Sequence, residues 1–258
     1  MTLPTVAVLG LGEAGGRLAG DLAAAGVEVR GYDPEAAAPP GVNRAPDTRA
    51  AVAGSDVVLS VNAAAVALPA AKEALPALSP GALYADLNTA GQELKGRLAA
   101  LVEEGGALFA DVALLGPVPA RGLRTPALAS GAGARAFAKA FGPLGMPVDA
   151  VSERAGDAAT LKLVRSVFMK GLAAAALESL AAAEAAGQRD WLEGQLEAVI
   201  GAQLLERLVE GSRAHAARRV DEMEAARELL LELGIEPRIT EASASLLAEL
   251  AVPPSSGR

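Results

Sequence analysis

The chain has 258 residues, a formal net charge of -8, and a composition that is 52% hydrophobic but only 3% aromatic. This length suits one large domain or two modest ones, and a core rich in alanine and leucine favours packed helices over an aromatic-rich sandwich. Zero cysteines and a single histidine exclude disulfides, thiolate zinc sites and a cysteine nucleophile, and we predict no metal site. The acidic balance argues against nucleic acid or an anionic membrane as a partner.

Short apolar runs alternate with helical patterns through the first part of the chain. The predicted strands are Thr5–Leu9, Val27–Arg30, Asp56–Val61, Leu83–Asp86 and Ala107–Val112, and Ala127–Ser130 and Pro147–Val151 could extend the sheet. The predicted helices between them are Ala14–Ala25, Ala63–Leu75, Gln92–Glu103 and Ala134–Phe141. This alternation is typical of an α/β domain with a doubly wound parallel sheet.

From about Ser152 onward only helical patterns remain. They cover Ala155–Ala186, Asp190–Glu210, Ser212–Leu233 and Thr240–Leu250, and the tail Pro253–Arg258 is expected to fray. We predict a dinucleotide-binding domain at residues 1–152, a long interdomain helix, and an all-α substrate and dimerisation domain at residues 153–258. Leu172–Ala186 and Leu196–Leu208 carry more apolar surface than so small a bundle can hide, which indicates a homodimer.

The N-terminal apolar stretch Thr5–Leu11 is interpreted as a buried strand. No cation precedes it and no clear cleavage site follows, as a signal peptide would require. Charged residues, glycine or proline interrupt every apolar run before the roughly 18 residues that a membrane-spanning helix needs. We therefore expect a cytoplasmic protein.

The strongest motif is a glycine-rich run that follows the first strand directly and opens a helix. Its residues are Gly10, Leu11, Gly12, Glu13, Ala14 and Gly15. This is the context that a dinucleotide-binding fingerprint requires: Gly10 permits the tight turn, Gly12 lets backbone approach a pyrophosphate, and Gly15 allows close helix packing. The helix N-terminus then offers N–H groups and positive dipole to the phosphates. A glycine-rich turn without a ligand is the alternative.

Asp33 closes the second predicted strand at close to the roughly 20-residue offset expected of a ribose-binding carboxylate. A carboxylate there accepts hydrogen bonds from both ribose hydroxyls and repels a 2′-phosphate, so the predicted cofactor is NAD. Arg30 lies nearby and could blunt the repulsion, which leaves NADP possible. An ordinary turn aspartate before Pro34 is the alternative.

Lys162 lies in an apolar helical run, with Ser166 and Lys170 one and two turns further along the same face. Apolar surroundings destabilise the charged form of a lysine, so that Lys162 could exchange protons near neutral pH. The alternative is a lysine at the edge of a buried helix with its ammonium group in solvent.

Four motifs make most of the chain resemble the β-hydroxyacid dehydrogenase superfamily, which includes 3-hydroxyisobutyrate and 6-phosphogluconate dehydrogenases. They are the glycine fingerprint, Asp86-Leu-Asn-Thr89, Asp111-Val-Ala-Leu-Leu-Gly-Pro117, and Gly156 followed by Lys162. The resemblance implies a Rossmann domain and a general acid/base lysine that matches Lys162. It also implies that Thr89 contacts the nicotinamide half of the cofactor and that Asn62 lies beside a cofactor ribose.

The chain departs from that family at the positions expected to bind substrate. The family's Ser-Gly-Gly loop aligns with Leu115, Gly116 and Pro117, and its asparagine pair after the lysine with Arg165 and Ser166. Its second motif glycine is replaced by alanine at residue 158. These features and the Lys170-Gly pair resemble a divergent branch with a short helical C-terminal domain.

Three residues after Lys162 are further site candidates. Ser166 would orient the lysine or the substrate, and Lys170 is placed among the substrate-binding residues with the 115–117 loop. Arg165 is a candidate anion clamp, with a solvated arginine as the alternative. The family also places a basic residue on a C-terminal helix near the cofactor, for which Arg219 is the candidate; the alternative is a solvated charged face that includes His215 and Arg218.

These features predict an NAD(P)-dependent oxidoreductase that transfers hydride between nicotinamide and a small hydroxy- or keto-acid or a related carbonyl compound. Lys162 would be its general acid/base. One alternative is an imine reductase, because relatives of the family do that chemistry. The other is a non-catalytic NAD(P)-binding redox sensor, which the altered substrate loop would favour.

Overall fold

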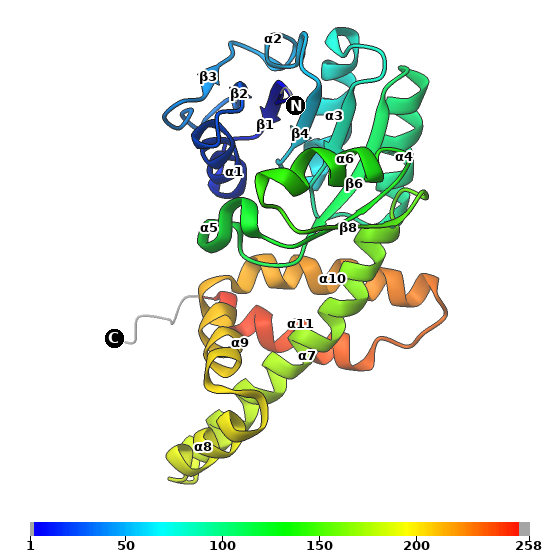
Figure 1. The fold of residues 1–258 in the computed structure, drawn as a ribbon. Coiled ribbons are helices and arrows are strands. Elements are labelled where there is room, and N and C mark those ends of the chain that lie inside the picture. The colour runs from blue at the N-terminus through cyan, green and yellow to red at the C-terminus, as the bar shows by residue number, and fades with distance from the viewer. Residues whose placement is uncertain (1–2, 253–258) are drawn as a thin grey trace. The chain divides into compact units, whose positions relative to one another are not determined.

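The structure, a computed structural model, describes residues 3–252 and consists of two compact units. The first unit, residues 1–162, holds a sheet with helices, and the second, residues 163–258, is helical in the part that the structure describes (Figure 1). The division falls inside one long helix, α7 (Asp157–Ala185), whose first turns belong to the sheet unit.

The first unit is built on an eight-stranded sheet in the order β3-β2-β1-β4-β5-β6-β7-β8. The strands are β1 (Val6–Leu9), β2 (Val29–Tyr32), β3 (Asn43–Arg44), β4 (Val57–Ser60), β5 (Leu83–Asp86), β6 (Leu108–Leu114), β7 (Ala127–Ser130) and β8 (Val148–Ser152). The order of the first six strands is that of a doubly wound dinucleotide-binding sheet, and the predicted fold class is confirmed. All neighbours are parallel except β6 and β7, so β7 and β8 run opposite to the other six.

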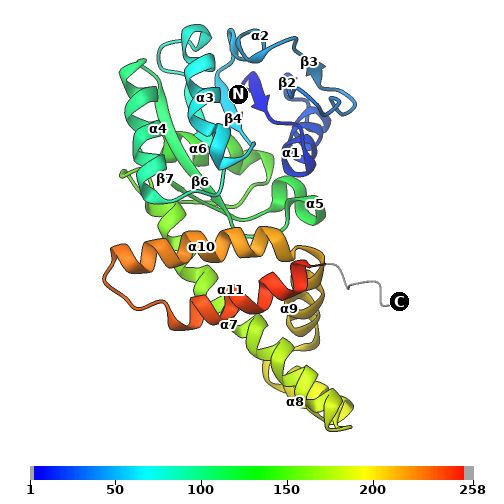
Figure 2. The ribbon, with the colours of Figure 1, turned by 180° about the vertical axis from the view of Figure 1, so that it is seen from behind.

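Helices cover both faces of this sheet. They are α1 (Glu13–Ala24), α2 (Thr48–Val52), α3 (Ala64–Ala74), α4 (Gln92–Glu104), α5 (Val118–Arg121) and α6 (Ala134–Phe141), with 3-10 turns at Leu75–Ala77, Gly122–Arg124 and Gly142–Leu144. Helices α1 and α6 lie on one face, and α2, α3 and α4 lie on the other (Figures 1 and 2).

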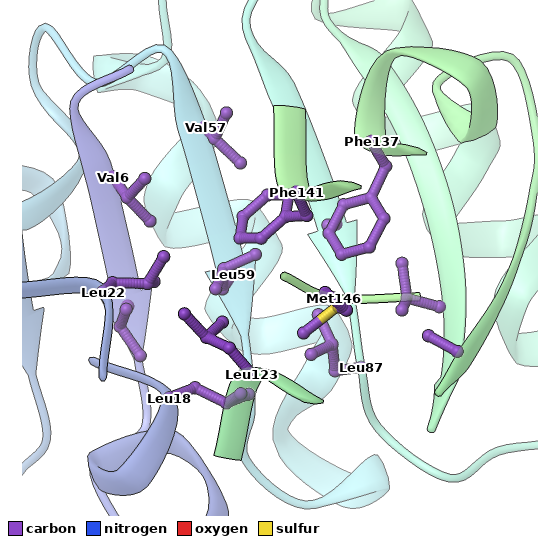
Figure 3. Packing of buried hydrophobic residues seen from close by; sticks show 14 of the residues in the cluster. Val6, Leu18, Leu22, Val57, Leu59, Leu87, Leu123, Phe137, Phe141 and Met146 are labelled. Atoms are coloured by element: carbon purple, nitrogen blue, oxygen red, sulfur yellow. The ribbon is translucent and has the colours of Figure 1, made fainter. Parts of the chain in front are cut away.

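Each face has its own apolar layer because successive strand residues point to opposite sides. Val6 and Val8 of β1 enter the layer under α1 and α6, whereas Ala7 and Leu9 enter the layer under α2, α3 and α4. Figure 3 shows the first layer, in which strand side chains meet α1, α6, Leu123 of a 3-10 turn, and the loop residues Leu87 and Met146. Both faces of the sheet are therefore buried, so a ligand-binding site is expected at the ends of the strands.

The helical unit contains the rest of α7 together with α8 (Arg189–Ile200), α9 (Ala202–Ala214), α10 (Ala216–Glu232) and α11 (Arg238–Ala251). The prediction of one helix over 190–210 is wrong, because Gly201, with a φ of +82°, separates α8 from α9. The predicted helix start at Ser212 is also wrong: Ser212 lies in α9, and α10 begins at Ala216. The predicted fraying at 253–258 lies outside the described residues.

Among the described residues, α7 alone is long and apolar enough, by length and composition, to cross a membrane. Helix α7 has 33% of its most apolar 18-residue window buried in the structure. Its buried Leu163 contacts Ala226 and Leu229 of α10, and its Ala176 belongs to a cluster with residues of α9.

Candidate functional site

The glycine-rich loop joins β1 to α1, and its three fingerprint glycines have different surroundings. Gly10 has a φ of +99°, which L residues rarely adopt, and a Cβ atom there would lie 2.3 Å from the carbonyl oxygen of Val61. A Cβ on Gly15 would lie 1.9 Å from the carbonyl oxygen of Gly10. Gly12 is exposed, and a Cβ there would meet no protein atom within 4 Å. Backbone atoms occupy the space beside Gly10 and Gly15, whereas the space beside Gly12 is open. This arrangement suits a pyrophosphate bound at the N-terminus of α1.

Asp33, at the end of β2, holds this loop in place. Its Oδ2 accepts a hydrogen bond of 2.8 Å from the N–H of Leu11, and its Oδ1 accepts from the N–H groups of Glu35 and Ala36. Burial alone would raise the pKa of Asp33, but these hydrogen bonds and the nearby Arg44 hold the pKa below its usual value. The carboxylate is therefore ionised at neutral pH, and a fourth lone-pair direction remains for a ligand hydroxyl.

The cation beside Asp33 is Arg44 of β3. Its Nη2 lies 3.3 Å from the backbone oxygen of Asp33. Arg30, the arginine that the sequence suggested here, instead pairs with Glu28 at 3.0 Å and donates to the carbonyl of Ala53. Arg44 lies on a two-residue strand without an apolar pattern, which explains why sequence reasoning missed it.

The residues after β4 and β5 come together at the carboxyl edge of the sheet. The N–H of Asn62 donates to Asn88 Oδ1 at 2.7 Å, and Asn88 Nδ2 donates to Asn62 Oδ1 at 2.9 Å. Thr89 follows Asn88 and is exposed; its Oγ1 accepts a hydrogen bond of 2.9 Å from Lys162 Nζ. Because Gly10 packs against the residue before Asn62, the glycine loop borders the same segment. The structure thus brings Asn62, Thr89 and Lys162 together.

The loop at Leu115–Pro117 lies at the same sheet edge, since it follows β6, which runs parallel to β5. The N–H of Leu115 donates to the carbonyl of Pro126 at 2.8 Å. Pro117 caps α5, and Gly116 is half-buried between them. This backbone hydrogen bond continues the pairing of β6 with β7 by one residue and holds the start of the loop.

A second polar cluster lies within the helical unit. Lys170 Nζ is 2.8 Å from Glu222 Oε2 and 3.2 Å from Ser166 Oγ, and Ser166 Oγ also bonds to Glu222 Oε1. Burial lowers the pKa of Lys170; Glu222 raises it, Arg219 and Arg165 lower it again, and the net pKa is below the usual value. Ser166 and Lys170 are thus joined through Glu222, a partner that helical spacing alone did not predict.

The remaining basic candidates differ in exposure. Arg219 is half-buried and donates to Ser212 Oγ. Arg165, Arg218 and His215 are exposed, and His215 stands at the junction of α9 and α10.

Comparison with known proteins identifies two families along the chain. Residues 5–141 match the NAD binding domain of 6-phosphogluconate dehydrogenase, and residues 183–250 match a domain of unknown function. An uncharacterised 28.5 kDa protein of Methanothermus fervidus is 28% identical over 200 residues, which are 76% of each protein. A conserved hypothetical protein from Sinorhizobium meliloti 1021 has a TM-score of 0.78 at 29% identity, over 100% of this chain and 92% of its own.

Two solved enzymes share the fold at lower identity. The 3-hydroxyisobutyrate dehydrogenase of Mycobacterium tuberculosis, solved with L-serine, has a TM-score of 0.84 at 21% identity, over 97% of this chain and 94% of its own. An imine reductase variant from Myxococcus stipitatus, solved with NAD+, has a TM-score of 0.69 at 22% identity, over 96% and 93%. These likenesses establish a fold shared with dehydrogenases and reductases.

Gly12→Ala and Gly15→Ala form a matched pair that separates ligand binding from packing. We expect Gly12→Ala to fold like the parent chain and to raise the Kd for NADH by about tenfold, because its methyl group stands where the pyrophosphate approaches. Gly15→Ala should lower the free energy of unfolding by about 1–3 kcal/mol through its clash with Gly10. Thermal unfolding and NADH fluorescence titration measure the two effects; unaltered NADH affinity in Gly12→Ala would place the pyrophosphate elsewhere.

Asp33 predicts which nicotinamide binds more tightly. Its ionised carboxylate repels a 2′-phosphate, so NADH should bind about tenfold more tightly than NADPH. Asp33→Asn should reduce that ratio, with Asp47→Asn, on the neighbouring loop, as the control. Isothermal titration with both reduced cofactors is the measurement, and tighter binding of NADPH to the parent chain would contradict the assignment.

Proposed function

The chain belongs to the family of the NAD binding domain of 6-phosphogluconate dehydrogenase, and from this premise we propose that it is an NAD(P)-dependent oxidoreductase acting on a small hydroxy- or keto-acid or a related carbonyl compound. One observation carries the proposal. The Nζ atom of Lys162 lies 2.9 Å from Thr89 Oγ1, at the sheet edge that the glycine loop also borders. A proton-transferring amine and a dinucleotide loop in one place are what hydride transfer to or from an alcohol carbon requires.

The sheet unit would hold the cofactor through its loops. The open backbone at Gly12 and the first amides of α1, from Glu13 and Ala14, would bind the pyrophosphate, and Asp33 would bind a ribose. Asn62 and Thr89 would line the nicotinamide half. When bound, the nicotinamide accepts or supplies the hydride.

On this proposal Lys162 moves the proton. In the oxidative direction the substrate hydroxyl gives its proton to neutral Nζ while its carbon gives up a hydride, so that the C–O bond becomes a carbonyl. In the reductive direction the ammonium form of Lys162 returns the proton to the carbonyl oxygen as the carbon gains the hydride. Thr89 Oγ1 accepts a hydrogen bond from Nζ and so orients the amine.

An acidic substrate suits the candidates in the helical unit. Lys170 is near two further cations, Arg165 and Arg219, and one carboxylate, Glu222. The cluster therefore keeps an excess of positive charge in a chain whose net charge is -8. A substrate carboxylate would complement that excess of positive charge.

Reduction of an imine is the second candidate, supported by the fold shared with an imine reductase. The substrate of that reaction is a cationic iminium, and a protonated Lys162 would repel it. Lys162 therefore favours chemistry at a C–O bond over chemistry at a C–N bond. A non-catalytic cofactor-binding sensor, the third reading of the sequence, would have no use for an amine held at this edge.

Lys162→Met tests the catalytic proposal. The parent chain is screened with a panel of hydroxy acids and NAD at alkaline pH, and the variant is assayed with the best substrate. We expect kcat to fall by about 10² to 10⁴ because the proton acceptor is lost, with NADH affinity retained. Lys72→Met, an exposed lysine on α3, is the control. Unchanged turnover in Lys162→Met removes the lysine from the mechanism, and no turnover by the parent chain favours the sensor.

We also propose that the chain is a homodimer that associates through an apolar groove of the helical unit. The groove is open to solvent, has a volume of about 390 Å³, and is lined by Val164, Val167, Phe168, Gly171, Leu172, Leu230 and Ile239. Phe168 and Ile239 are 68% and 63% exposed, which is unusual for large apolar residues. A second copy of the chain would bury them.

Phe168→Glu should weaken this association. A charge in the groove is expected to raise the dimer dissociation constant by about thirtyfold or more, as loss of a central aromatic residue does at other interfaces. Val66→Glu, at an exposed site on α3 outside the groove, is the control. Sedimentation velocity over a range of concentrations measures the effect, and a monomeric parent chain would end the proposal.

A further inference from the structure

A row of buried polar residues crosses the middle of the sheet in register. Ser60 of β4 is paired with Asp86 of β5, Asp86 with Asp111 of β6, and Asp111 with Ser130 of β7. All four side chains are fully buried. None of them belongs to the proposed cofactor or substrate contacts, although Asp86 and Asp111 open two of the sequence motifs. Buried charges persist only where partners compensate them, so the partners indicate what the row does.

Lys95 of α4 is the positive charge that compensates the row. Its Nζ lies 2.6 Å from Asp86 Oδ2, 2.9 Å from Asp111 Oδ1 and 3.1 Å from the backbone oxygen of Asp86. These two oxygens of Asp86 accept hydrogen bonds from the ammonium group, and Asp111 Oδ1 forms an ion pair with it. Burial alone would lower the pKa of Lys95, but Asp86 and Asp111 raise it above the usual value, so the lysine stays charged.

On one side this cluster captures the N-terminus of α7. Asp111 Oδ2 accepts a hydrogen bond of 2.9 Å from the N–H of Ala159, and Ser130 Oγ accepts one of 3.0 Å from the N–H of Ala158. Both N–H groups are in the first turn of α7 and have no partner within the helix. Two carboxylates and one ammonium leave a net negative charge, which the positive end of the helix dipole balances. The helix that carries Lys162 is thus capped from inside the sheet.

On the other side the same cluster holds the loops at the carboxyl edge. Asp86 Oδ1 accepts a hydrogen bond of 2.5 Å from Asn88 Nδ2. Asn88 in turn binds the backbone N–H and the side-chain oxygen of Asn62. Thr89, the partner of Lys162, directly follows Asn88 in the chain.

We propose that Lys95 is a positioning residue, which ties the loops of Asn62 and Thr89 to the first turn of α7 and so sets where Lys162 lies relative to Thr89. The inference rests on the proposed role of Lys162 in proton transfer. An apolar side chain of similar length would fill the volume of Lys95 without joining the two aspartates. If Lys95 only filled space, an apolar side chain could replace it. If Lys95 positions the two loops, its charge is required.

Lys95→Met tests the charge, and Leu98→Ala, a buried residue one turn further along α4, is the control for general destabilisation. Urea is added until the two variants have the same free energy of unfolding, and they are compared under those conditions. Hydrogen exchange at the amides of Ala158, Ala159 and Asn62 reports both ends of the cluster, and NADH titration reports the cofactor loops. We expect about tenfold faster exchange at all three amides and about tenfold weaker NADH binding in Lys95→Met only. Equal behaviour of the two variants overturns the proposal.

Asp111→Asn serves if Lys95→Met does not fold, because an asparagine keeps the shape and leaves one carboxylate for Lys95. Exchange should then accelerate at Ala159, which loses its charged acceptor, and at Ala158, whose acceptor Ser130 Oγ is itself held by Asp111 Oδ2. Asn62, held through Asp86, should stay protected. Unchanged exchange at Ala158 and Ala159 contradicts the proposal. The result is independent of the catalytic test: Lys162→Met with full turnover removes the proposed function, and unaltered exchange in the cluster variants removes only the positioning role.

Discussion

The enclosure of one ammonium group between two carboxylates, at Lys95, Asp86 and Asp111, is the constraint on which the sheet unit depends. Strand side chains alternate between the two faces, so slipping β5 or β6 by one residue would move its aspartate into the apolar layer under α1 and α6. The alkyl and aromatic side chains of that layer provide neither a hydrogen-bond donor nor a cation for a carboxylate. The charged cluster therefore selects the register of the central strands, and apolar burial, which tolerates sliding, supplies the bulk of the stability.

The same register places the candidate site. In a sheet with the order 3-2-1-4-5-6 the chain leaves β1 and β4 in opposite directions, and ligands bind in the crevice at their carboxyl ends. Gly10 lies at the end of β1 and packs against the residues that end β4. Its positive φ and the lack of room for a Cβ have one cause, the close approach of two backbones. Asn88 then links the end of β4 to that of β5, and Thr89 links β5 to Lys162.

Sequence patterns predicted the elements whose local signal is strong. Leu83–Asp86 and Ala134–Phe141 were predicted with the bounds that the structure has, because an apolar run and a helical period end there at polar or glycine residues. The reversal at β7 was not predictable, since apolar periodicity carries no strand direction, and the exposed β3 has no apolar residue to mark it. Lys95 was missed for a related reason: a lysine on an amphipathic helix has the same pattern whether its head reaches solvent or two buried aspartates. Its partners lie nine and sixteen residues away, and only the folded sheet brings them together.

The two units carry different kinds of information about function. The match to the dehydrogenase NAD domain ends at residue 141, and the residues that argue for the cofactor and for proton transfer all lie in the sheet unit. Residues 183–250 of the helical unit match a domain of unknown function, and its charges are arranged differently: Glu222 pairs with Lys170 and also acts on Arg219, and Arg165 is a further cation near Lys170. Hydride transfer requires only that the reacting carbon carry a hydroxyl or carbonyl group, whereas the positive charges of the helical unit bear on the charge of the rest of the substrate. On the proposal that the chain is an oxidoreductase, anionic hydroxy and keto compounds therefore come before neutral alcohols in a search for its substrate.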